Sequence, residues 1–583
     1  MTKIFDDPTH FSEDLLDGFV AANRQYVARI DGGVVRSTVS PEGTVALVVG
    51  GGSGHYPAFA GLVGAGLAMG SACGNMFASP AVSQIYRVAK ASHQGGGVLL
   101  SYGNYAGDVL HFGQAQEKLR AEGIDTRTVM ATDDIASASI EEIHKRRGIA
   151  GDLTVFKVAG AAAEAGYDLD EVERLAIKAN DRTRSLGVAF AGCTLPGASE
   201  PLFTVPEGQM SIGLGIHGEP GISEQPMPTA SELAEILVSK LLADLPADAG
   251  KRVVPILNGL GTIKYEELFV LYGRIAKLLE AEGLTIVEPE CGELVTSLDM
   301  SGLSLTLFWI DDELEQLWAA PADTPAYRKG NLAPRERLEA SAIAAAIEVE
   351  HEDATETSLA LAIVANHLIG AVRETIETNA SDLGDLDAIA GDGDHGIGMT
   401  RGIQGAAAAS EKSLADGRGV HELLTAAAEE WSERAGGTSG ALWAAALTAV
   451  GDSLGNRDDY SPKDAAEAAA AGAAAITKLG KANLGDKTMV DAMLPYVDAL
   501  KDAVDGGASI TEALAGAAKT ATSAAEATSD LRPKLGRARP LAEKSVGHPD
   551  AGAISFGMIV TRIADEAAAR GWTGAASTEK DTK

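Results

Sequence analysis

The chain has 583 residues, 45% hydrophobic and 22% charged, a composition typical of folded protein and long enough for several domains. Its 82 acidic and 48 basic side chains give a net charge of -34, which argues against binding to nucleic acid or to an anionic membrane. Three cysteines without CxxC spacing predict neither a disulfide framework nor a zinc site. With no signal-peptide pattern and no long uncharged apolar stretch, we expect a cytoplasmic protein.

Residues 1–330 alternate short apolar runs with helical patterns, which predicts α/β units with a mainly parallel sheet. The runs interpreted as strands are "TVALVVGG", "GGVLLSYG", "DLTVFKVAG", "SLGVAFAG", "RVVPILNG" and "LTLFWID". Because one sheet rarely holds so many units, we predict two lobes, about 1–185 and 186–330. The helical run "LDEVERLAIKANDRTRSLG" is expected to bridge them.

The character of the sequence changes near residue 330. Residues 331–357 are charged and Ala-rich, which predicts a partly helical linker. Residues 358–576 contain successive Ala-rich amphipathic segments, which predict an all-α bundle or helical barrel. The tail, 577–583, is expected to be frayed.

The first glycine-rich stretch, "VVGGGSGHYP", follows a predicted strand and contains His55. Three familiar motifs fail: Pro57 stands where GxGxxG needs glycine, no P-loop lysine follows, and His55 occupies the last position of GxSxG. One interpretation is a tight strand-to-helix turn. The other is a loop whose backbone N–H groups and His55 face a small polar ligand.

Two further loops of the first half contain side chains suited to acid–base or nucleophilic chemistry. Asp108, in "GNYAGDVLHF", follows a predicted strand end, where ligands gather in α/β sheets. It is a candidate base or hydroxyl anchor, or else the N-cap of the next helix. His217, in "GLGIHGEPG", lies among glycines that leave space for a molecule close to its ring.

The helical half contains an acidic turn, "DLDAIAGDGDHG", with Asp387, Asp392 and Asp394. Carboxylates this close repel one another unless a cation holds them, and oxygen ligands suit Mg2+ or Ca2+. The EF-hand spacing is absent, so a calcium loop is not expected. A solvated acidic turn without metal is the alternative.

Farther along, "AGGTSGALW" places Gly437, Thr438, Ser439 and Gly440 directly before an apolar helix. Free backbone donors and the helix dipole at such a start attract anions without a lysine. Acids for a metal and a helix start for phosphates together predict a metal–nucleotide site.

Taken in order, these segments resemble the single-chain, ATP-dependent dihydroxyacetone kinases over nearly the whole chain. The motifs "GGGSGH", "GNYAGD", "GIHGEPG" and "TSLDMSG" are similar to the ketone-binding kinase domain of that family. The motifs "GDGDHG", "GGTSG", "GDKTM" and "GRA…GHPDAGA" are similar to its all-α nucleotide-binding domain. The resemblance implies a two-lobed α/β kinase domain followed by a helical-barrel domain, and a homodimer.

The resemblance also implies roles for the residues of the kinase domain. His217 would bond covalently to the carbonyl carbon of a small ketose, Asp108 would be the base near the attacking hydroxyl, and His55 would hydrogen-bond the substrate. The remaining expected substrate-binding residues are Gly52, Ser53, Gly54, Tyr56 and Gly103.

In the helical domain the resemblance implies binding of ATP and Mg2+. Asp387, Asp392 and Asp394 would hold the metal. The expected nucleotide-binding residues are Asp394, His395, Gly396, Gly437, Thr438, Ser439, Gly440, Gly480, Thr488, Met489, Asp550, Ala551 and Gly552.

Two departures from the family pattern concern the substrate. The family usually has GHEP where this chain has Tyr56 before Pro57, and a lysine where this chain has Gly103. Loss of that lysine removes a donor and opens volume, so we expect erythrulose to be favoured over dihydroxyacetone. Plain dihydroxyacetone kinase activity and a ketone-sensing regulator are the alternatives; the enantiomer, the hydroxyl used and an FMN-cyclising side activity stay open.

Overall fold

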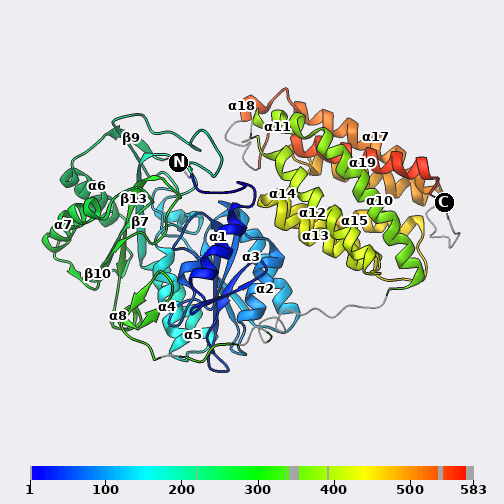
Figure 1. The fold of residues 1–583 in the computed structure, drawn as a ribbon. Helices are drawn as coiled ribbons and strands as arrows, with labels where there is room; N and C mark the ends of the chain where they lie inside the picture. Colours follow the sequence, from blue (N-terminus) through cyan, green and yellow to red (C-terminus); the bar gives the residue numbers. More distant parts are fainter. Residues whose placement is uncertain are drawn as a thin grey trace. The chain divides into compact units, whose positions relative to one another are not determined.

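The computed structural model describes residues 3–219, 221–333, 335–338, 341, 354–389, 391, 393–535 and 542–572. The chain divides into two compact units, Met1–Glu348 and Val349–Lys583. The first is an α/β unit and the second is helical (Figure 1). Most of the predicted linker, 331–357, and the whole predicted tail, 577–583, lie outside the described residues.

The first sheet of the α/β unit has six strands in the order β1-β2-β4-β3-β5-β6. Its core is parallel, since β3 pairs in parallel with β4 and β5, and β5 with β6. The strands are β1 (Val27–Ile30), β2 (Gly33–Arg36), β3 (Ala46–Ser53), β4 (Gly70–Met76), β5 (Val98–Gly103) and β6 (Thr126–Ala131). The carboxyl ends of β3 and β5 therefore lie side by side at one edge.

The second sheet differs from our expectation of a mainly parallel arrangement. Its order is β11-β10-β13-β7-β8-β9, with β12 also paired to β10, and the ladders from β10 through β13 and β7 to β9 are antiparallel. Its strands are β7 (Thr183–Ala191), β8 (Gln209–Ile212), β9 (Ser223–Pro226), β10 (Arg252–Gly259), β11 (Thr285–Ile286), β12 (Glu290–Gly292) and β13 (Ser301–Trp309). The apolar runs are strands, but apolar content does not encode strand direction.

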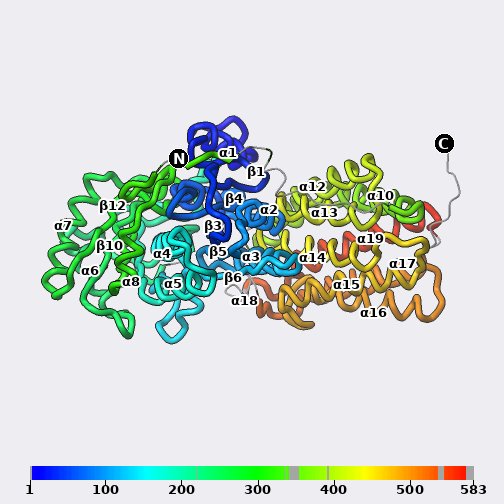
Figure 2. The backbone as a smooth tube through the Cα atoms, turned by 90° about the horizontal axis from the view of Figure 1, so that it is seen from below, coloured from blue at the N-terminus to red at the C-terminus, as the bar shows by residue number. Residues whose placement is uncertain are grey.

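Helices cover both sheets and fill the space between them. They are α1 (Phe11–Ala22), α2 (Val82–Ser92), α3 (Ala106–Ala121), α4 (Asp152–Glu164), α5 (Leu169–Asp181), α6 (Ala230–Leu242), α7 (Tyr265–Ala281) and α8 (Asp312–Ala319); a small ladder joins β14 (Ala322–Asp323) and β15 (Arg328–Lys329). Figure 2 shows the layers in turn: α6 and α7, the second sheet, α4 and α5, the first sheet, then α2 and α3.

The segment "DLTVFKVAG", which we interpreted as a strand, is the first part of α4. This prediction was wrong because a short apolar run fits a fully buried helix as well as a buried strand. Every residue from Asp152 to Ala163 is buried, since α4 packs within the core shared by both sheets. The predicted bridging helix, α5, ends at Asp181, and β7 follows at once.

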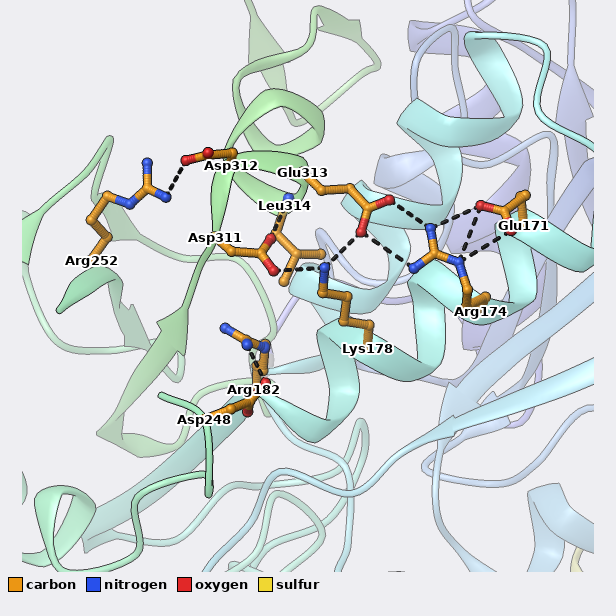
Figure 3. A network of polar contacts seen from close by, with 10 residues as sticks. All are labelled: Glu171, Arg174, Lys178, Arg182, Asp248, Arg252, Asp311, Asp312, Glu313 and Leu314. Atoms are coloured by element: carbon orange, nitrogen blue, oxygen red, sulfur yellow. Dashed lines mark hydrogen bonds and ion pairs between the residues drawn. The ribbon is translucent and has the colours of Figure 1, made fainter. Parts of the chain in front are cut away.

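An ion-pair network ties α5 to the start of α8 (Figure 3). Arg174 pairs with Glu171 and Glu313, and Lys178 pairs with Asp311 and Glu313. These side chains are partly exposed, so each pair stabilises the fold by only about 0–1 kcal/mol. Their joint effect is to fasten the middle helix layer to the end of β13.

The helical unit is a ring of antiparallel helices. Each neighbour packs on the next in the order α10-α12-α13-α14-α15-α16-α17-α19, and α19 closes the ring on α10. The helices are α10 (Glu356–Thr378), α11 (Ala380–Ala388), α12 (His395–Ala415), α13 (Val420–Ala435), α14 (Gly437–Leu454), α15 (Pro462–Gly480), α16 (Val490–Asp505), α17 (Ile510–Ala527), α18 (Ala542–Ser545) and α19 (Ala551–Arg570). Alternation places the starts of α12, α14, α16 and α19 at one end.

Small residues allow this close packing, as the sequence predicts. A Cβ on Gly402 of α12 would lie 2.8 Å from the Trp431 ring of α13. By length and composition alone, α10 is the one described helix apolar enough to cross a membrane, and core helices of globular proteins pass the same test. In this structure α10 packs against α12, α13 and α19.

Candidate active site

The ends of two parallel strands and one loop of the second sheet bring the first group of predicted residues together. His55 follows β3, Asp108 lies in the first turn of α3 just after β5, and His217 lies between β8 and β9. Ser297 fixes the His217 loop, because its hydroxyl donates to the carbonyl oxygen of Ile216. Residues from four distant segments thus meet at one edge of the first sheet.

The two histidines are in direct contact, with 2.9 Å between their Nε2 atoms. His55 Nδ1 lies 2.7 Å from the carbonyl oxygen of Thr296 and can only donate to it, so the Nε2 of neutral His55 holds a lone pair. Burial, reinforced by the neighbouring His217, lowers the pKa of His55 to about 3. His55 is therefore a neutral acceptor beside His217.

Glu219 holds the other side of the His217 ring. Its carboxylate accepts from His217 Nδ1 at 3.1 Å and from the backbone N–H of His217 at 3.0 Å. Although burial opposes the shift, the hydrogen bond and charge of His217 lower the pKa of Glu219 to about 2. An ionised carboxylate thus orients the imidazole through its Nδ1 atom.

Glycine at position 215 is required by this arrangement. A Cβ at this position would lie only 2.1 Å from Glu219 Oε2. The Glu219 carboxylate therefore occupies the space that a side chain at position 215 would need. Rings complete the enclosure of His217: Tyr105 lies edge-on with 4.7 Å between centroids, and Phe77 with 5.4 Å. The His217 side chain is therefore held by the Glu219 carboxylate and by the rings of Tyr105 and Phe77.

Asp108 is not an N-cap, because α3 begins after Tyr105 and Asp108 lies inside its first turn. Its Oδ1 atom is buried and has no hydrogen-bond partner in the described part of the chain. Burial raises the pKa of Asp108 to about 6, against the opposing effects of Ser79 and His217. A buried carboxyl that titrates close to neutrality is suited to accept a proton.

The other predicted substrate residues occupy the same edge in different ways. Gly52 and Gly54 pack tightly against the 77–78 segment, and the Ser53 hydroxyl donates to the carbonyl oxygen of Gly74. Tyr56 turns its half-exposed ring toward Phe19 of α1, with 5.9 Å between centroids. The glycine-rich loop is thus shaped largely by internal packing.

The second group of predicted residues gathers at the ring end where four helices begin. His395 Nε2 of α12 lies 3.0 Å from the Ser555 hydroxyl of α19, and the Cβ position of Gly552 lies 3.5 Å from Met489 Cβ beside α16. Gly437 opens α14 with a φ of 60°, and its Cβ position faces open space. The set also includes Asp394, Gly396, Thr438, Ser439, Gly440, Gly480, Thr488, Asp550 and Ala551, all at or next to helix ends at this side.

The carboxylates at this end fit a divalent cation. Burial and the nearby Asp387 raise the pKa of Asp394, and burial with the charges of Asp491 and Asp387 raises the pKa of Asp550 to about 6. A divalent cation bound beside these carboxyl groups would favour their ionised form. Asp392 lies outside the described residues, and among the others no three acids, histidines or cysteines already converge on a metal position.

Comparison with known families decides what these two sites belong to. Residues 17–326 match the Dak1 domain and residues 389–565 match the DAK2 domain. The chain belongs to the dihydroxyacetone kinase family. It is a phosphotransferase with an α/β Dak1 region and a helical DAK2 region, as its motifs predict.

Several relatives within this family span the full chain. An L-erythrulose kinase from Pectobacterium atrosepticum is 56% identical, covering 97% of this chain and 96% of the relative. A D-erythrulose kinase from Mycolicibacterium smegmatis is 53% identical, covering 97% and 98%. The dihydroxyacetone kinase of C. freundii, solved with AMP-PNP and Mg2+, is 29% identical with a TM-score of 0.52, covering 97% of this chain and 99% of that one.

Sequence reasoning assigned no role to three of the residues that build this kinase site. Glu219 and Tyr105 stand within quoted motifs, so their proximity to His217 and Asp108 was a usable signal. Thr296 stands in "TSLDMSG", but nothing in the sequence pairs it with His55.

Proposed function

We propose that this chain transfers the γ-phosphoryl group of ATP, with Mg2+, to a terminal hydroxyl of a small ketose, and that it favours erythrulose over dihydroxyacetone. The observation that carries the proposal is the imidazole of His217, held between ionised Glu219 and neutral His55, near the free carboxylate oxygen of Asp108. The names of relatives at 52–56% identity support the four-carbon substrate.

His217 binds the ketone covalently in this proposal. Two Nε2 atoms 2.9 Å apart need one proton between them, and since His55 Nε2 is an acceptor, that proton belongs to His217. His55 Nε2 first takes this proton, which leaves a lone pair on His217 Nε2 to attack the carbonyl carbon. The C=O π bond breaks, and the carbonyl oxygen takes the proton from His55. The positive charge stays on the ring beside Glu219, so the hemiaminal forms without a net change of charge.

Asp108 then acts as the base. Its Oδ1 accepts the proton of the terminal hydroxyl while that oxygen attacks phosphorus. With a pKa of about 6, the carboxylate is ionised at neutral pH and its conjugate acid is not too weak to release the proton afterwards.

The helical unit binds the nucleotide in this proposal. The starts of α12, α14, α16 and α19 present backbone N–H groups to the phosphates. Asp387, Asp392 and Asp394 would hold Mg2+, which when bound neutralises phosphate charge. A cytoplasmic location and a homodimer complete the proposal.

The test measures ADP release by the purified full chain with ATP and Mg2+, offering D-erythrulose, L-erythrulose, dihydroxyacetone and glycerol in parallel. We expect a higher kcat/KM for one erythrulose than for dihydroxyacetone and none for glycerol, which has no carbonyl to bond to His217. A higher kcat/KM for dihydroxyacetone would make plain dihydroxyacetone kinase the function. Turnover of glycerol at a similar rate would overturn the covalent step.

A further inference from the structure

One buried carboxyl at the edge of this site has no role in the steps above. Asp152 is the first residue of α4 and is 2% exposed. Its Oδ1 atom is buried without a hydrogen-bond partner in the described part of the chain. A buried polar atom left in this state costs free energy, so a functional partner is the natural explanation.

The absence of side chains at two glycines leaves the space that this carboxyl occupies. A Cβ on Gly148 would lie 2.6 Å from Asp152 Oδ1, and a Cβ on Gly103 would lie 3.4 Å from Asp152 Oδ2. Gly103 is the residue that ends β5, two positions before Tyr105. The carboxyl of Asp152 therefore borders the position where family members have a lysine.

The residues around Asp152 adjoin the proposed substrate site at His217. A Cβ on Gly103 would also lie 3.3 Å from the Tyr105 ring, which packs against His217. The Tyr105 hydroxyl is a second buried polar group without a partner among the described residues. Burial, with the charges of Asp133 and Asp108 nearby, raises the pKa of Asp152 well above its ordinary value.

The backbone N–H groups at the start of α4 already have backbone partners. A carboxylate at a helix start ordinarily accepts from free backbone N–H groups. At α4 the N–H groups of Asp152, Leu153 and Thr154 donate instead to the carbonyl oxygens of the residues three positions before them. The free Oδ1 of Asp152 is thus not needed to cap α4.

We propose that Asp152 determines substrate specificity by hydrogen-bonding a hydroxyl on the part of a four-carbon ketose that dihydroxyacetone lacks. The proposal rests on the proposed function, because it assigns the extra recognition of the same kinase site. Asp152 and Gly103 act together: the glycine gives access, and the carboxyl supplies the partner for the added hydroxyl. Tyr105 offers its hydroxyl to the same region.

The test compares kcat/KM for the preferred erythrulose and for dihydroxyacetone in the full-length protein. Asp152→Leu keeps a similar shape but removes both polar atoms, and Asp152→Asn keeps a donor and an acceptor. We expect the ratio of the two kcat/KM values to fall about tenfold or more in Asp152→Leu, mainly through KM for erythrulose, and to be largely restored in Asp152→Asn. Dihydroxyacetone kinetics serve as the internal reference.

Thr154→Val is the matched control, because Thr154 is also buried at the start of α4 but its hydroxyl already donates to the carbonyl oxygen of Gly151. Thermal unfolding of each variant measures any general loosening of the helix. The inference is overturned if Asp152→Leu keeps the ratio, or if Thr154→Val changes it equally. If the unchanged protein itself prefers dihydroxyacetone, the proposed function fails, a result visible before any variant is measured.

Discussion

In the α/β unit, His217 is held by side chains that already satisfy one another, whereas at the helix starts of the second unit carboxyl groups lie buried near other acids. His55, Glu219 and the carbonyl of Thr296 fix the imidazole before any ligand arrives. Burial and neighbouring acids, Asp387 among them, instead raise the pKa values of Asp394 and Asp550. In the proposed function, the first site is preorganised for the carbonyl carbon of the ketose, and the second is arranged to bind metal and phosphate charge.

Because the two sites differ in this way, we expect substitutions in them to affect different properties of the enzyme. Removing a side chain from the first site should destroy selectivity for the carbonyl and leave the nucleotide unaffected. Removing one from the second should change the metal requirement and leave ketone binding unaffected. Three variants test that separation.

The largest effect is expected for His217→Ala, which removes the atom that we propose bonds to the ketone. Ketose-dependent ADP release should fall to background, and the carbonyl carbon of 13C-labelled ketose should no longer convert to a tetrahedral carbon in NMR spectra of the complex. Affinity for ATP with Mg2+ should stay within about twofold of the unchanged protein. Loss of nucleotide binding in this variant would show that the two sites are not separable.

Asp108→Asn should lower kcat by on the order of 10²–10⁴, because the proton of the attacking hydroxyl loses its acceptor. In the unchanged protein the raised pKa of Asp108 makes activity rise with pH through about 6, since only the ionised form accepts a proton. A pH profile of kcat/KM checks this, and the rise should vanish in the variant. The NMR signal of the ketone adduct should persist; its disappearance would assign Asp108 to binding instead.

The smallest effect is expected for Asp394→Asn, which removes charge at the start of α12. The Mg2+ concentration for half-maximal activity should rise about tenfold or more, while KM for the ketose stays unchanged. Chelation with EDTA should abolish activity in both proteins, and added Mg2+ should restore it. An unaltered Mg2+ requirement would contradict the assignment of this turn to the metal.

Much of the site was predictable because it lies in short motifs. The loops with His55, Asp108 and His217 are recognisable by their glycines, and the helical half is recognisable by its alanine-rich periodicity. The prediction for α4 failed because a helix buried on all sides has no polar face to reveal its period. The antiparallel second sheet was missed because strand direction depends on pairing between distant segments.

The sequence by itself determined the two chemistries: an imidazole and a carboxylate on loops for a ketose, and acids with glycine-rich helix starts for a metal nucleotide. Only the tertiary structure decided which groups share a proton or a charge. The two partners of His55, Thr296 and His217, lie 241 and 162 residues from it along the chain. Asp152 reaches Gly103 only through the packing of α4 against β5. Protonation and recognition depend on distances of about 3 Å, which long-range packing sets and local sequence does not.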